Sequence, residues 1–322
     1  MNDISLLNVS NLQINIGSTA LVRGLSFKLR AGEALGIVGE SGCGKSLTAL
    51  SIMRLLSQPP MHIESGEIIF NGQDLVRMPE RSLEKIRGRE VAMIFQEPMT
   101  SLNPVFSVGE QVSEVLYLHE NLSAKSVQQK TQELFDKVGL SAARIAHRFP
   151  HQLSGGQRQR VMIAMSLACS PKLLIADEPT TALDVTVQAQ ILELIDELRA
   201  ELGMAILLIA HDLGVVRHHC NQVAVMYAGQ IVEYGSSTQV FSSPSHPYTR
   251  ALIETIPAVN EPGKPLPSIE GTVPAPGAMP KGCAFSPRCQ YSQEQCTKQT
   301  PELAEQLQSD HQVRCWFPVS AS

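Results

Sequence analysis

The eight residues from Gly39 to Ser46 read G-E-S-G-C-G-K-S and match the phosphate-loop pattern G-x-x-x-x-G-K-S in full. Glycine is needed in such a loop because successive backbone N–H groups wrap a phosphate, and a Cβ at Gly42 or Gly44 would block its approach. Lys45 then reaches the β- and γ-phosphates, and the Ser46 hydroxyl can ligate Mg²⁺. We therefore expect a nucleotide to contact the whole loop, which consists of Gly39, Glu40, Ser41, Gly42, Cys43, Gly44, Lys45 and Ser46.

Two acidic residues, Asp177 and Glu178, follow the apolar stretch Leu173–Ala176. A buried strand that ends in two acids places carboxylates at the carboxyl edge of a sheet, where ligands bind in open α/β folds. Asp177 would hold Mg²⁺ through water, and Glu178 would polarise the attacking water of a phosphoryl transfer. A strand that simply enters solvent through two acids is the alternative, but the phosphate loop in the same chain favours the chemical interpretation.

Strands and helices alternate around these residues. Ala34–Val38 is a buried-strand candidate that runs into the phosphate loop, and Leu47–Leu56 then has the apolar spacing of a helix. A second helix is expected over Val187–Leu202 and a further strand over Ala205–Ala210. This alternation predicts an α/β fold with a largely parallel, helix-covered sheet.

Two other kinds of segment interrupt that pattern. Short strands and glycine turns fill the chain up to Phe70, where Asn71-Gly72 predicts a tight hairpin. A second hairpin is expected where Gln222–Tyr227 and Gln230–Tyr234 flank Ala228-Gly229. Between about 97 and 150 the sequence predicts an inserted helical lobe, whose amphipathic helices are Val108–Leu118 and Ser126–Val138.

The composition excludes several classes of protein. The 322 residues suffice for about two domains, and 43% of them are hydrophobic, which allows a substantial core. A net charge of −5 and a charged fraction of 18% argue against a nucleic-acid partner and against a disordered acidic chain. Apolar stretches such as Met204–Ala210 are far shorter than the roughly 18 residues that cross a bilayer, and the start MNDISLLNVS lacks the features of a signal peptide. We therefore expect an intracellular chain without a membrane span.

The cysteines are unevenly distributed. Of the seven, Cys283, Cys289, Cys296 and Cys315 lie in the last 40 residues, together with a high density of proline. Their spacings of 5, 6 and 18 intervening residues lack the close pairs typical of zinc sites, whereas an iron–sulfur cluster tolerates other spacings. An iron–sulfur cluster, a zinc ion, and free or disulfide-linked thiols all remain open.

The stretch Leu153-Ser154-Gly155-Gly156-Gln157 is followed by helical apolar spacing over Arg158–Ala168. With this stretch the chain resembles the nucleotide-binding subunits of ABC transporters. In that family the signature opens a helix whose N-terminus grips the γ-phosphate of ATP held by the partner subunit, which suits the partial positive charge of a helix start. The resemblance implies a head-to-tail dimer with two ATP molecules at the seam, contacted by Ser154, Gly155, Gly156 and Gln157.

Three further elements match this family by position. Gln96, after Val91–Phe95, resembles the Q-loop glutamine, which contacts Mg²⁺ or water. Thr181-Ala182-Leu183-Asp184 resembles the D-loop that crosses the dimer seam, and His211 resembles the switch histidine. The resemblance therefore implies catalytic roles for Glu178, His211 and Gln96, nucleotide contacts from Gln96, Asp177 and Asp184, and Mg²⁺ ligation by Ser46, Gln96 and Asp177. One departure is Ile16, which stands before Gly17 where the family usually stacks an aromatic residue on adenine.

A narrower resemblance comes from the stretch from Gln96 to Pro104, from His246-Pro247-Tyr248-Thr249 and from the C-terminal extension. These are similar to the ATPase subunits of oligopeptide, dipeptide and nickel importers, above all the dipeptide D-type subunit. That family implies two separate transmembrane permease subunits, a second homologous ATPase in a heterodimer, and a periplasmic solute-binding protein. It also implies a peripheral position on the cytoplasmic face of the bacterial inner membrane, and a [4Fe-4S] cluster on the four C-terminal cysteines.

The predicted fold is a P-loop NTPase core of the ABC type with an antiparallel β subdomain, an inserted helical subdomain and a small Cys-rich C-terminal extension. The nucleotide-binding domain is expected over 1–257 and the extension over 258–322. The predicted function is that of an ATP-hydrolysing motor for uptake of di- and oligopeptides. Alternatives are import of nickel or another small solute, an iron–sulfur sensor with secondary ATPase activity, and an ABC ATPase of DNA repair or translation. The last is disfavoured because only about 110 residues separate Ser46 from Ser154, without heptads, and because there is one cassette.

Overall fold

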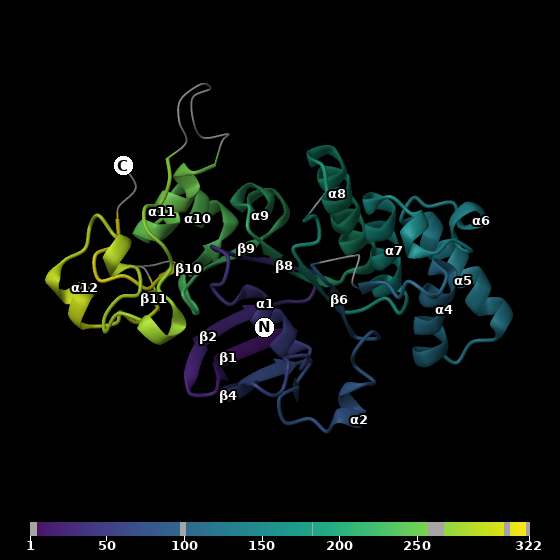
Figure 1. The fold of residues 1–322 in the computed structure, drawn as a ribbon, viewed down its shortest axis with the longest axis horizontal. Coiled ribbons are helices and arrows are strands. Elements are labelled where there is room, and N and C mark those ends of the chain that lie inside the picture. The colour runs from purple at the N-terminus through teal and green to yellow at the C-terminus, as the bar shows by residue number, and fades with distance from the viewer. Residues whose placement is uncertain (1–4, 97–100, 182, 257–266, 306–309, 320–322) are drawn as a thin grey trace. The chain divides into compact units, whose positions relative to one another are not determined.

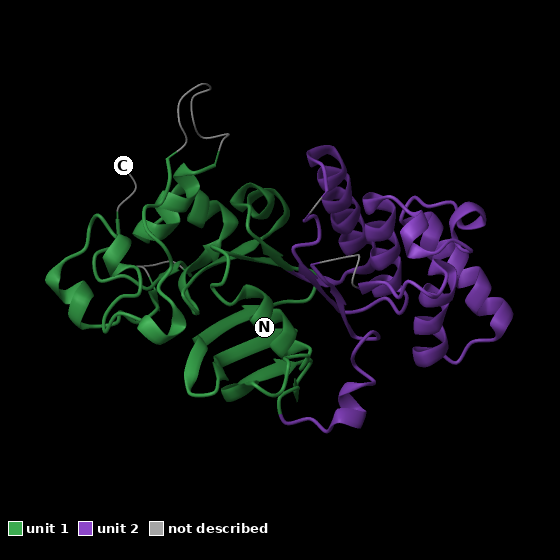
Figure 2. Cartoon of the chain, in the orientation of Figure 1, with its two compact units in different colours: residues 1–76, 208–322 green, residues 77–207 purple. Residues whose placement is uncertain are grey.

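Two units make up the chain: residues 1–76 together with 208–322, and residues 77–207 (Figure 2). The computed structural model describes every residue except 1–4, 97–100, 182, 257–266, 306–309 and 320–322 (Figure 1). Among the described residues, no helix combines the length and the apolar character that crossing a bilayer demands.

The first unit contains an antiparallel sheet with the strand order β2-β1-β4-β5. These strands are β1 (Leu7–Ile16), β2 (Thr19–Leu29), β4 (Met61–Phe70) and β5 (Gln73–Asp74). In β1 buried apolar residues alternate with more exposed ones up to Val9, and the alternation resumes at Leu12. Between these two residues the pairing register shifts, and Asn11 has φ 47°. This extra residue returns the later side chains to the buried face.

The hairpin predicted after Phe70 is confirmed. Phe70 pairs with Gln73 across an antiparallel ladder, and Asn71 and Gly72 have φ of 47° and 78°. Two consecutive positive φ angles are what a two-residue hairpin turn demands, and Asn-Gly supplies them with little strain.

A second sheet in the first unit carries the phosphate loop. Here β3 pairs in parallel with β9. On the other side of β9 the order continues with β10, β12 and β11, and each of these strands is antiparallel to the one before it. All five residues of β3 are buried, as expected for a continuous apolar run in a sheet covered on both faces. The strands are β3 (Ala34–Val38), β9 (Gln222–Tyr227), β10 (Gln230–Ser236), β11 (Ala304–Glu305) and β12 (Gln312–Val313). The C-terminal region thus extends the sheet at β10, and the predicted second hairpin is confirmed.

Helix α9 lies close against β3 because Gly36 has no side chain: a Cβ there would be 2.2 Å from a methyl group of Val216. The α-helices of this unit are α1 (Lys45–Ile52), α9 (Leu213–His219), α10 (Ser237–Ser242), α11 (Pro247–Glu254) and α12 (Glu294–Lys298). Two short 3₁₀ turns, η3 (Pro276–Ala278) and η4 (Ser286–Arg288), lie in the C-terminal region. The linker predicted after Pro257 begins in residues 257–266, outside the described part.

The second unit combines two parallel strands with the helical lobe. β6 (Val91–Ile94) pairs with β7 (Leu173–Asp177). The helices are α2 (Glu80–Leu83), α4 (Val108–His119), α5 (Ala124–Lys137), α6 (Ala142–Ile145), α7 (Gly155–Leu167) and α8 (Val185–Leu202), and the 3₁₀ turn η1 (Pro150–Gln152) precedes α7. The strand β8 (Ala205–Ala210) crosses the boundary between the units. The predicted helices and strands of this region are confirmed, with ends that differ by a few residues.

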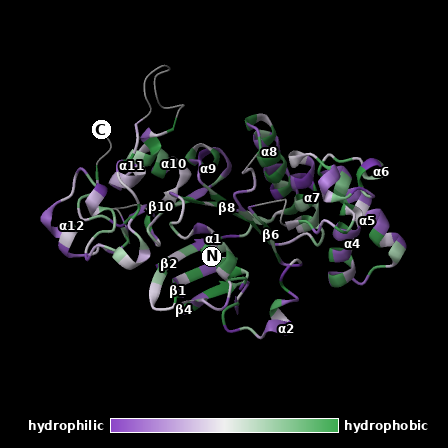
Figure 3. Ribbon diagram, in the orientation of Figure 1, coloured by the Kyte–Doolittle hydropathy of each residue, from purple (hydrophilic) through white to green (hydrophobic). Residues whose placement is uncertain are grey.

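Polar caps explain where the long helices of this unit begin. The side chains of Ser107, Ser123, Ser154 and Asp184 accept hydrogen bonds from backbone N–H groups in the first turns of α4, α5, α7 and α8. Most residues of α5 are hydrophilic, as the colour of its ribbon in Figure 3 shows. Its buried residues Val127, Thr131, Leu134 and Phe135 recur at helical spacing on one face.

Candidate nucleotide-binding site

The phosphate loop joins β3 to α1, and its glycines determine its shape. Gly39, Gly42 and Gly44 have φ of 154°, 79° and 105°, a range that other residues adopt only with strain. A Cβ on Gly39 would also lie 2.1 Å from the Met226 carbonyl oxygen. The backbone itself therefore demands the glycines that the motif predicted.

Lys45 is the cation of the loop, and only 5% of it is exposed. Its ammonium donates hydrogen bonds to the carbonyl oxygens of Gly39 and Glu40, at 2.7 and 3.1 Å. These bonds hold the charge at the start of α1, where the free backbone amides of a helix also favour an anion. A phosphate on this loop would compete for the same ammonium.

Cys43 is fully buried within the loop, and its sulfur lies 3.9 Å from the Lys45 nitrogen. Burial raises the pKa of the Cys43 thiol. A neutral, buried thiol packs as a small apolar group, so Cys43 fills space inside the loop.

Gln96 and Glu178 meet in the second unit. β6 and β7 run in parallel with Ile94 opposite Ala176, so the residues that follow these strands share one sheet edge. Gln96 Nε2 donates to Glu178 Oε2 at 3.0 Å, and the Thr181 hydroxyl donates to the same oxygen at 3.0 Å. The carboxylate is thereby oriented by two donors from two different loops.

Two features mark the acidic pair as a built site. Asp177, the last residue of β7, is only 4% exposed. Glu178 has φ 47°, a left-handed conformation that costs a non-glycine residue roughly 1–2 kcal/mol. Strain of this kind persists only where the surroundings fix it, and it concentrates at functional positions.

The signature stretch begins α7. Ser154 is its cap: the hydroxyl accepts from the Gln157 N–H at 3.3 Å, and Gln157 Oε1 accepts from the Ser154 N–H at 3.1 Å. This reciprocal pair is a capping box. Gly156 is needed for packing, since a Cβ there would lie 2.9 Å from a methyl group of Val187. The amides of Gly155 and Gly156 therefore open a helix of 13 residues.

Asp184 has a structural role within its own unit. Its carboxylate accepts from the Val187 N–H at 3.0 Å and caps α8. Thr181 contacts Glu178, whereas Ala182 of the same predicted D-loop lies outside the described residues.

Two predicted site residues of the first unit, His211 and Ile16, lie at the ends of strands. His211 directly follows β8, and Asp212 caps α9 by accepting from the Gly214 N–H at 2.7 Å. Ile16 ends β1 with 39% of its surface exposed, so an apolar face is available where the family places an aromatic ring.

Comparison with known proteins identifies the family. Residues 22–181 match the family "ABC transporter", and residues 232–296 match "Oligopeptide/dipeptide transporter, C-terminal region". The chain is 50% identical to the oligopeptide transport ATP-binding protein OppD of Haemophilus influenzae, with 97% of both chains covered. It is 47% identical to the Escherichia coli protein of the same name, over 98% of this chain and 94% of the relative. The chain belongs to the ATP-binding subunits of oligopeptide/dipeptide ABC transporters.

Solved structures agree with this assignment. The ABC ATPase matches a dimeric structure of the ATP-binding cassette MJ0796 bound to ADP and Pi with a TM-score of 0.64 and 26% identity, over 72% of this chain and 98% of that one. It also matches cbiO1 from Clostridium perfringens, with a TM-score of 0.64 and 28% identity, over 74% of this chain and 90% of that one. The predicted ABC-type P-loop NTPase fold and the ATPase class are confirmed, and ATP and Mg²⁺ fit this class.

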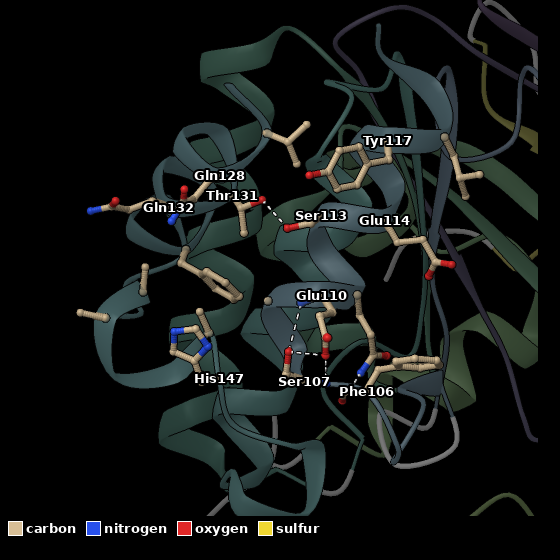
Figure 4. A pocket seen from close by; sticks show the side chains of 18 residues that line it. Phe106, Ser107, Glu110, Ser113, Glu114, Tyr117, Gln128, Thr131, Gln132 and His147 are labelled. Carbon is tan, nitrogen blue, oxygen red and sulfur yellow. Dashed lines mark hydrogen bonds between the residues drawn. The ribbon is translucent and has the colours of Figure 1, made fainter. Parts of the chain in front are cut away.

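The helical lobe of the ABC ATPase has a groove of about 740 Å³ between α4, α5 and α6. Phe106, Tyr117 and Leu118 line it with 50%, 56% and 71% of their surfaces exposed. In Figure 4, Tyr117 lies on one side of the groove and Gln128 and His147 on the other. Exposed apolar side chains gathered in one groove are typical of surfaces that bind a protein, a membrane or a ligand.

The four C-terminal cysteines line one tight cavity, which is otherwise walled mainly by aromatic side chains such as those of Phe285 and Trp316. All four are free thiols, and the cavity has room for about one water molecule, at about 10 Å³. Burial raises the pKa of Cys315 to about 12, and burial likewise raises the pKa values of Cys283 and Cys289. Among the described residues, no three of these side chains converge on a single metal ion.

His246 adds a polar atom to the wall of this cavity. It is 1% exposed, and its Nδ1 accepts from the Tyr248 N–H at 3.0 Å, which leaves the proton of a neutral ring on Nε2. Burial lowers the pKa of His246 to about 4, so the ring is neutral. Nε2 is buried and makes no hydrogen bond of 3.5 Å or shorter within the described part of the chain, although the Arg314 backbone acts to raise the pKa of the ring.

Several contacts were not predicted from the sequence. Tyr248 and Arg288 bind Glu40 of the phosphate loop, and Thr181 binds Glu178. Tyr248 and Thr181 lay inside motifs that were recognised, but no pattern linked them to these partners. Arg288 could have been singled out only as a basic residue beside a clustered cysteine.

Proposed function

We propose that this ABC ATPase is the motor subunit of a bacterial importer that couples ATP hydrolysis to the uptake of di- and oligopeptides. The observation that carries the proposal is the peptide-transporter C-terminal region at 232–296, in the same chain as an ABC core. Relatives named as oligopeptide transport proteins, 47–50% identical over nearly the whole chain, support the same cargo. Two separate permease subunits would form the channel, and a periplasmic solute-binding protein would select the peptide. The ATPase would lie peripherally on the cytoplasmic face of the inner membrane.

The phosphate loop binds the triphosphate in this proposal. Its backbone amides surround the β-phosphate and Lys45 neutralises the β- and γ-phosphates. Ser46, Gln96 and Asp177 offer the oxygen ligands that Mg²⁺ prefers, and the burial of Asp177 at the end of β7 fits a metal-facing carboxylate. When bound, Mg²⁺ offsets the charge that develops on the phosphates.

Glu178 polarises the water that attacks the γ-phosphate. The hydrogen bonds from Gln96 and Thr181 fix its carboxylate, which suits a reaction that depends on positioning more than on covalent chemistry. Since Gln96 lies two residues after β6 and precedes the helical lobe in the chain, it is placed to report the state of this carboxylate to the lobe. His211 would contact the γ-phosphate.

The signature helix acts on a second nucleotide in this proposal. The capping box of Ser154 and Gln157 keeps the amides of Gly155 and Gly156 at a helix start, which attracts the γ-phosphate of ATP held by a partner subunit. The partner is a second, homologous ATPase, and Asp184 lies in the loop that crosses the seam.

The groove of the helical lobe receives a cytoplasmic helix of a permease subunit. Three exposed apolar side chains, Phe106, Tyr117 and Leu118, line one groove, as expected for a surface that binds an amphipathic helix by its apolar face. The lining also contains polar groups, among them Gln128 and the mutually hydrogen-bonded hydroxyls of Ser113 and Thr131.

We propose that the four cysteines hold a [4Fe-4S] cluster, as the resemblance to the importer family implies. A zinc ion needs all its sulfurs about 2.3 Å from one point, whereas the sulfurs of a cluster bind different irons. All four thiols line one cavity, which supports a shared site, and the buried His246 Nε2–H in the same wall could donate to a cluster sulfur. A bound cluster would supply a redox centre or a structural crosslink. Because the cavity now has room for about one water, binding must spread its walls.

A broad absorbance near 400 nm with bound iron would support the cluster, whereas zinc, or no metal, in the purified chain would refute it.

Reconstitution of the complete importer in lipid vesicles tests the peptide motor. Di- or oligopeptide with the solute-binding protein should stimulate ATP hydrolysis and accumulate inside the vesicles, whereas nickel should do neither. Glu178→Gln should slow turnover on the order of 10²-fold while ATP still binds. Glu201→Gln, which changes an exposed carboxylate paired with Lys137, is the matched control. Nickel-driven stimulation would support the alternative cargo, and ATPase activity that vanishes with iron removal would favour an iron–sulfur sensor.

A further inference from the structure

Glu40, the second residue of the phosphate loop, is held by side chains that follow it in the chain by more than 200 residues. Its backbone N–H donates to the Tyr248 hydroxyl at 3.0 Å. Its carboxylate accepts from Arg288 Nη1 at 2.9 Å and 3.2 Å, through both oxygens. Lys45 donates to its carbonyl oxygen. The donor and both acceptors of this one residue are therefore engaged.

Arg288 is held in place by burial and by several hydrogen bonds. Only 4% of its side chain is exposed, and its other donors bind the carbonyl oxygens of Glu270 at 2.8 Å and Ile269 at 3.2 Å. Its guanidinium also lies 5.8 Å from the centre of the Tyr227 ring, and Nη1 donates to the Tyr227 hydroxyl at 3.3 Å. A guanidinium held on all sides loses little freedom when it binds a carboxylate, and burial reduces screening of the ion pair by salt.

The charge of Glu40 needs such a partner. A triphosphate carries several negative charges, and a carboxylate on the loop that binds it would repel them unless it is neutralised. The buried Tyr248 phenol cannot do this because it carries no positive charge in either protonation state, and burial raises its pKa so that it stays neutral. Arg288 is the cation that the structure pairs with Glu40.

We propose that Arg288 is a positioning residue of the nucleotide site, which neutralises Glu40 and anchors the first turn of the phosphate loop. The C-terminal region thereby contributes to ATP affinity, although its sequence contains no nucleotide motif. The proposal rests on the assignment of Gly39–Ser46 as the ATP phosphate site.

Arg314 provides a matched control. Like Arg288, it is partly buried and directly precedes one of the clustered cysteines. Its Nε donates to the Ile231 carbonyl oxygen at 2.9 Å and its Nη1 to the Pro301 carbonyl oxygen at 3.1 Å. It therefore ties the C-terminal region to β10 by bonds that do not involve the phosphate loop.

The test is the equilibrium affinity of the purified full chain for a non-hydrolysable ATP analogue with Mg²⁺. Arg288→Gln should weaken binding about tenfold, which corresponds to about 1.4 kcal/mol. The double variant Arg288→Gln with Glu40→Gln should return to within about threefold of the wild type, because no uncompensated charge remains. Arg314→Gln should bind within about twofold of the wild type. In steady-state hydrolysis by the complete transporter, Arg288→Gln should raise KM for ATP more than it lowers kcat.

Unchanged affinity in Arg288→Gln would overturn the proposal. So would equal losses in Arg288→Gln, the double variant and Arg314→Gln, because these would show only a loosened C-terminal region. If Arg288→Gln does not fold, Arg288→Lys is the second variant, because it keeps the charge and loses the guanidinium donors that bind the carbonyl oxygens of Glu270 and Ile269. It should weaken binding about threefold, and wild-type affinity there would refute the proposal. Lys45→Ala distinguishes failure of the ATP site at Gly39–Ser46 from failure of the proposed role of Arg288. If Lys45→Ala binds ATP normally, the assignment of the loop is wrong. If Lys45→Ala loses binding and the Arg288 variants do not, only the role of Arg288 is wrong.

Discussion

The phosphate loop and the four-cysteine cavity lie in the same unit but obtain their chemistry in opposite ways. The loop offers backbone amides and one lysine from eight successive residues, and its glycines follow from the φ angles of that backbone. The cavity uses side chains that are spread from Cys283 to Cys315 and meet only after the chain has folded around His246 and Phe285. A site made of successive residues is visible as a motif, whereas a site made of dispersed side chains is visible only as a composition.

Substitution of Gly42 tests the backbone half of this comparison with the largest expected effect. Gly42 and Gly72 have nearly the same φ, 79° and 78°, and a Cβ on either would meet no atom within 4 Å. Alanine at either position should lower the free energy of unfolding by about 1 kcal/mol. Only Gly42→Ala should also weaken binding of Mg²⁺ and ATP, by roughly 10²-fold, because its Cβ occupies the space a phosphate approaches.

Titration calorimetry and thermal unfolding of both variants give the two quantities. Equal nucleotide affinity in Gly42→Ala and Gly72→Ala would show that the loop does not bind phosphate through its backbone.

The groove of the helical lobe extends the comparison to a second site that side chains assemble. Leu118→Glu places a charge on a residue that lines the groove and is 71% exposed. We expect roughly tenfold weaker assembly with the permease subunits and unchanged ATP binding, because an amphipathic helix would lose an apolar contact.

Co-purification of the complex measures this effect. Leu122→Glu, an exposed leucine of the same lobe that does not line the groove, is the control. Loss of assembly in both variants would indicate a general effect of charge on the lobe, and normal assembly of Leu118→Glu would exclude the groove as the docking site.

Cys296→Ser tests the cavity with the smallest expected effect on the ATPase. A serine hydroxyl is a poor iron ligand, so the absorbance near 400 nm and most of the bound iron should disappear. The melting temperature should fall by a few degrees. ATP affinity should stay within about threefold of the wild type because, among the described residues, no hydrogen bond joins these four thiols to the loop.

Cys169→Ser, a change at a partly buried cysteine of the other unit, is the control and should keep the iron. Equal iron content in wild type and Cys296→Ser would contradict ligation by this cavity.

The sequence predicted most of the fold because its strongest patterns are local. The hairpin at Asn71-Gly72 depends on two φ angles that this dipeptide supplies, and α4 and α5 begin at serine caps ahead of amphipathic spacing. Helix α7 begins at Gly155, earlier than its apolar spacing indicated, since the capping box of Ser154 and Gln157 extends it into the signature.

The candidate site was predictable where it is contiguous, as in the phosphate loop, the acidic pair after β7 and the signature. Its wiring was not. The bond from Gln96 to Glu178 depends on the register that puts Ile94 opposite Ala176, and Thr181 reaches the same carboxylate through a turn with no strong pattern. Residues 97–100 and 182 of two predicted motifs lie outside the described part, so their contacts stay predictions.

By itself the sequence determined the family, the phosphate loop and the residues around it, because amide wrapping, capping and strand burial each depend on neighbours within a few positions. Only the tertiary structure decided which distant side chains share a site. Arg288 reaches Glu40, and four separated cysteines reach one cavity, because β12 extends the sheet at β10 and brings the C-terminal region against the loop-bearing strands. Such contacts depend on how elements pair and pack, which no short stretch of sequence encodes.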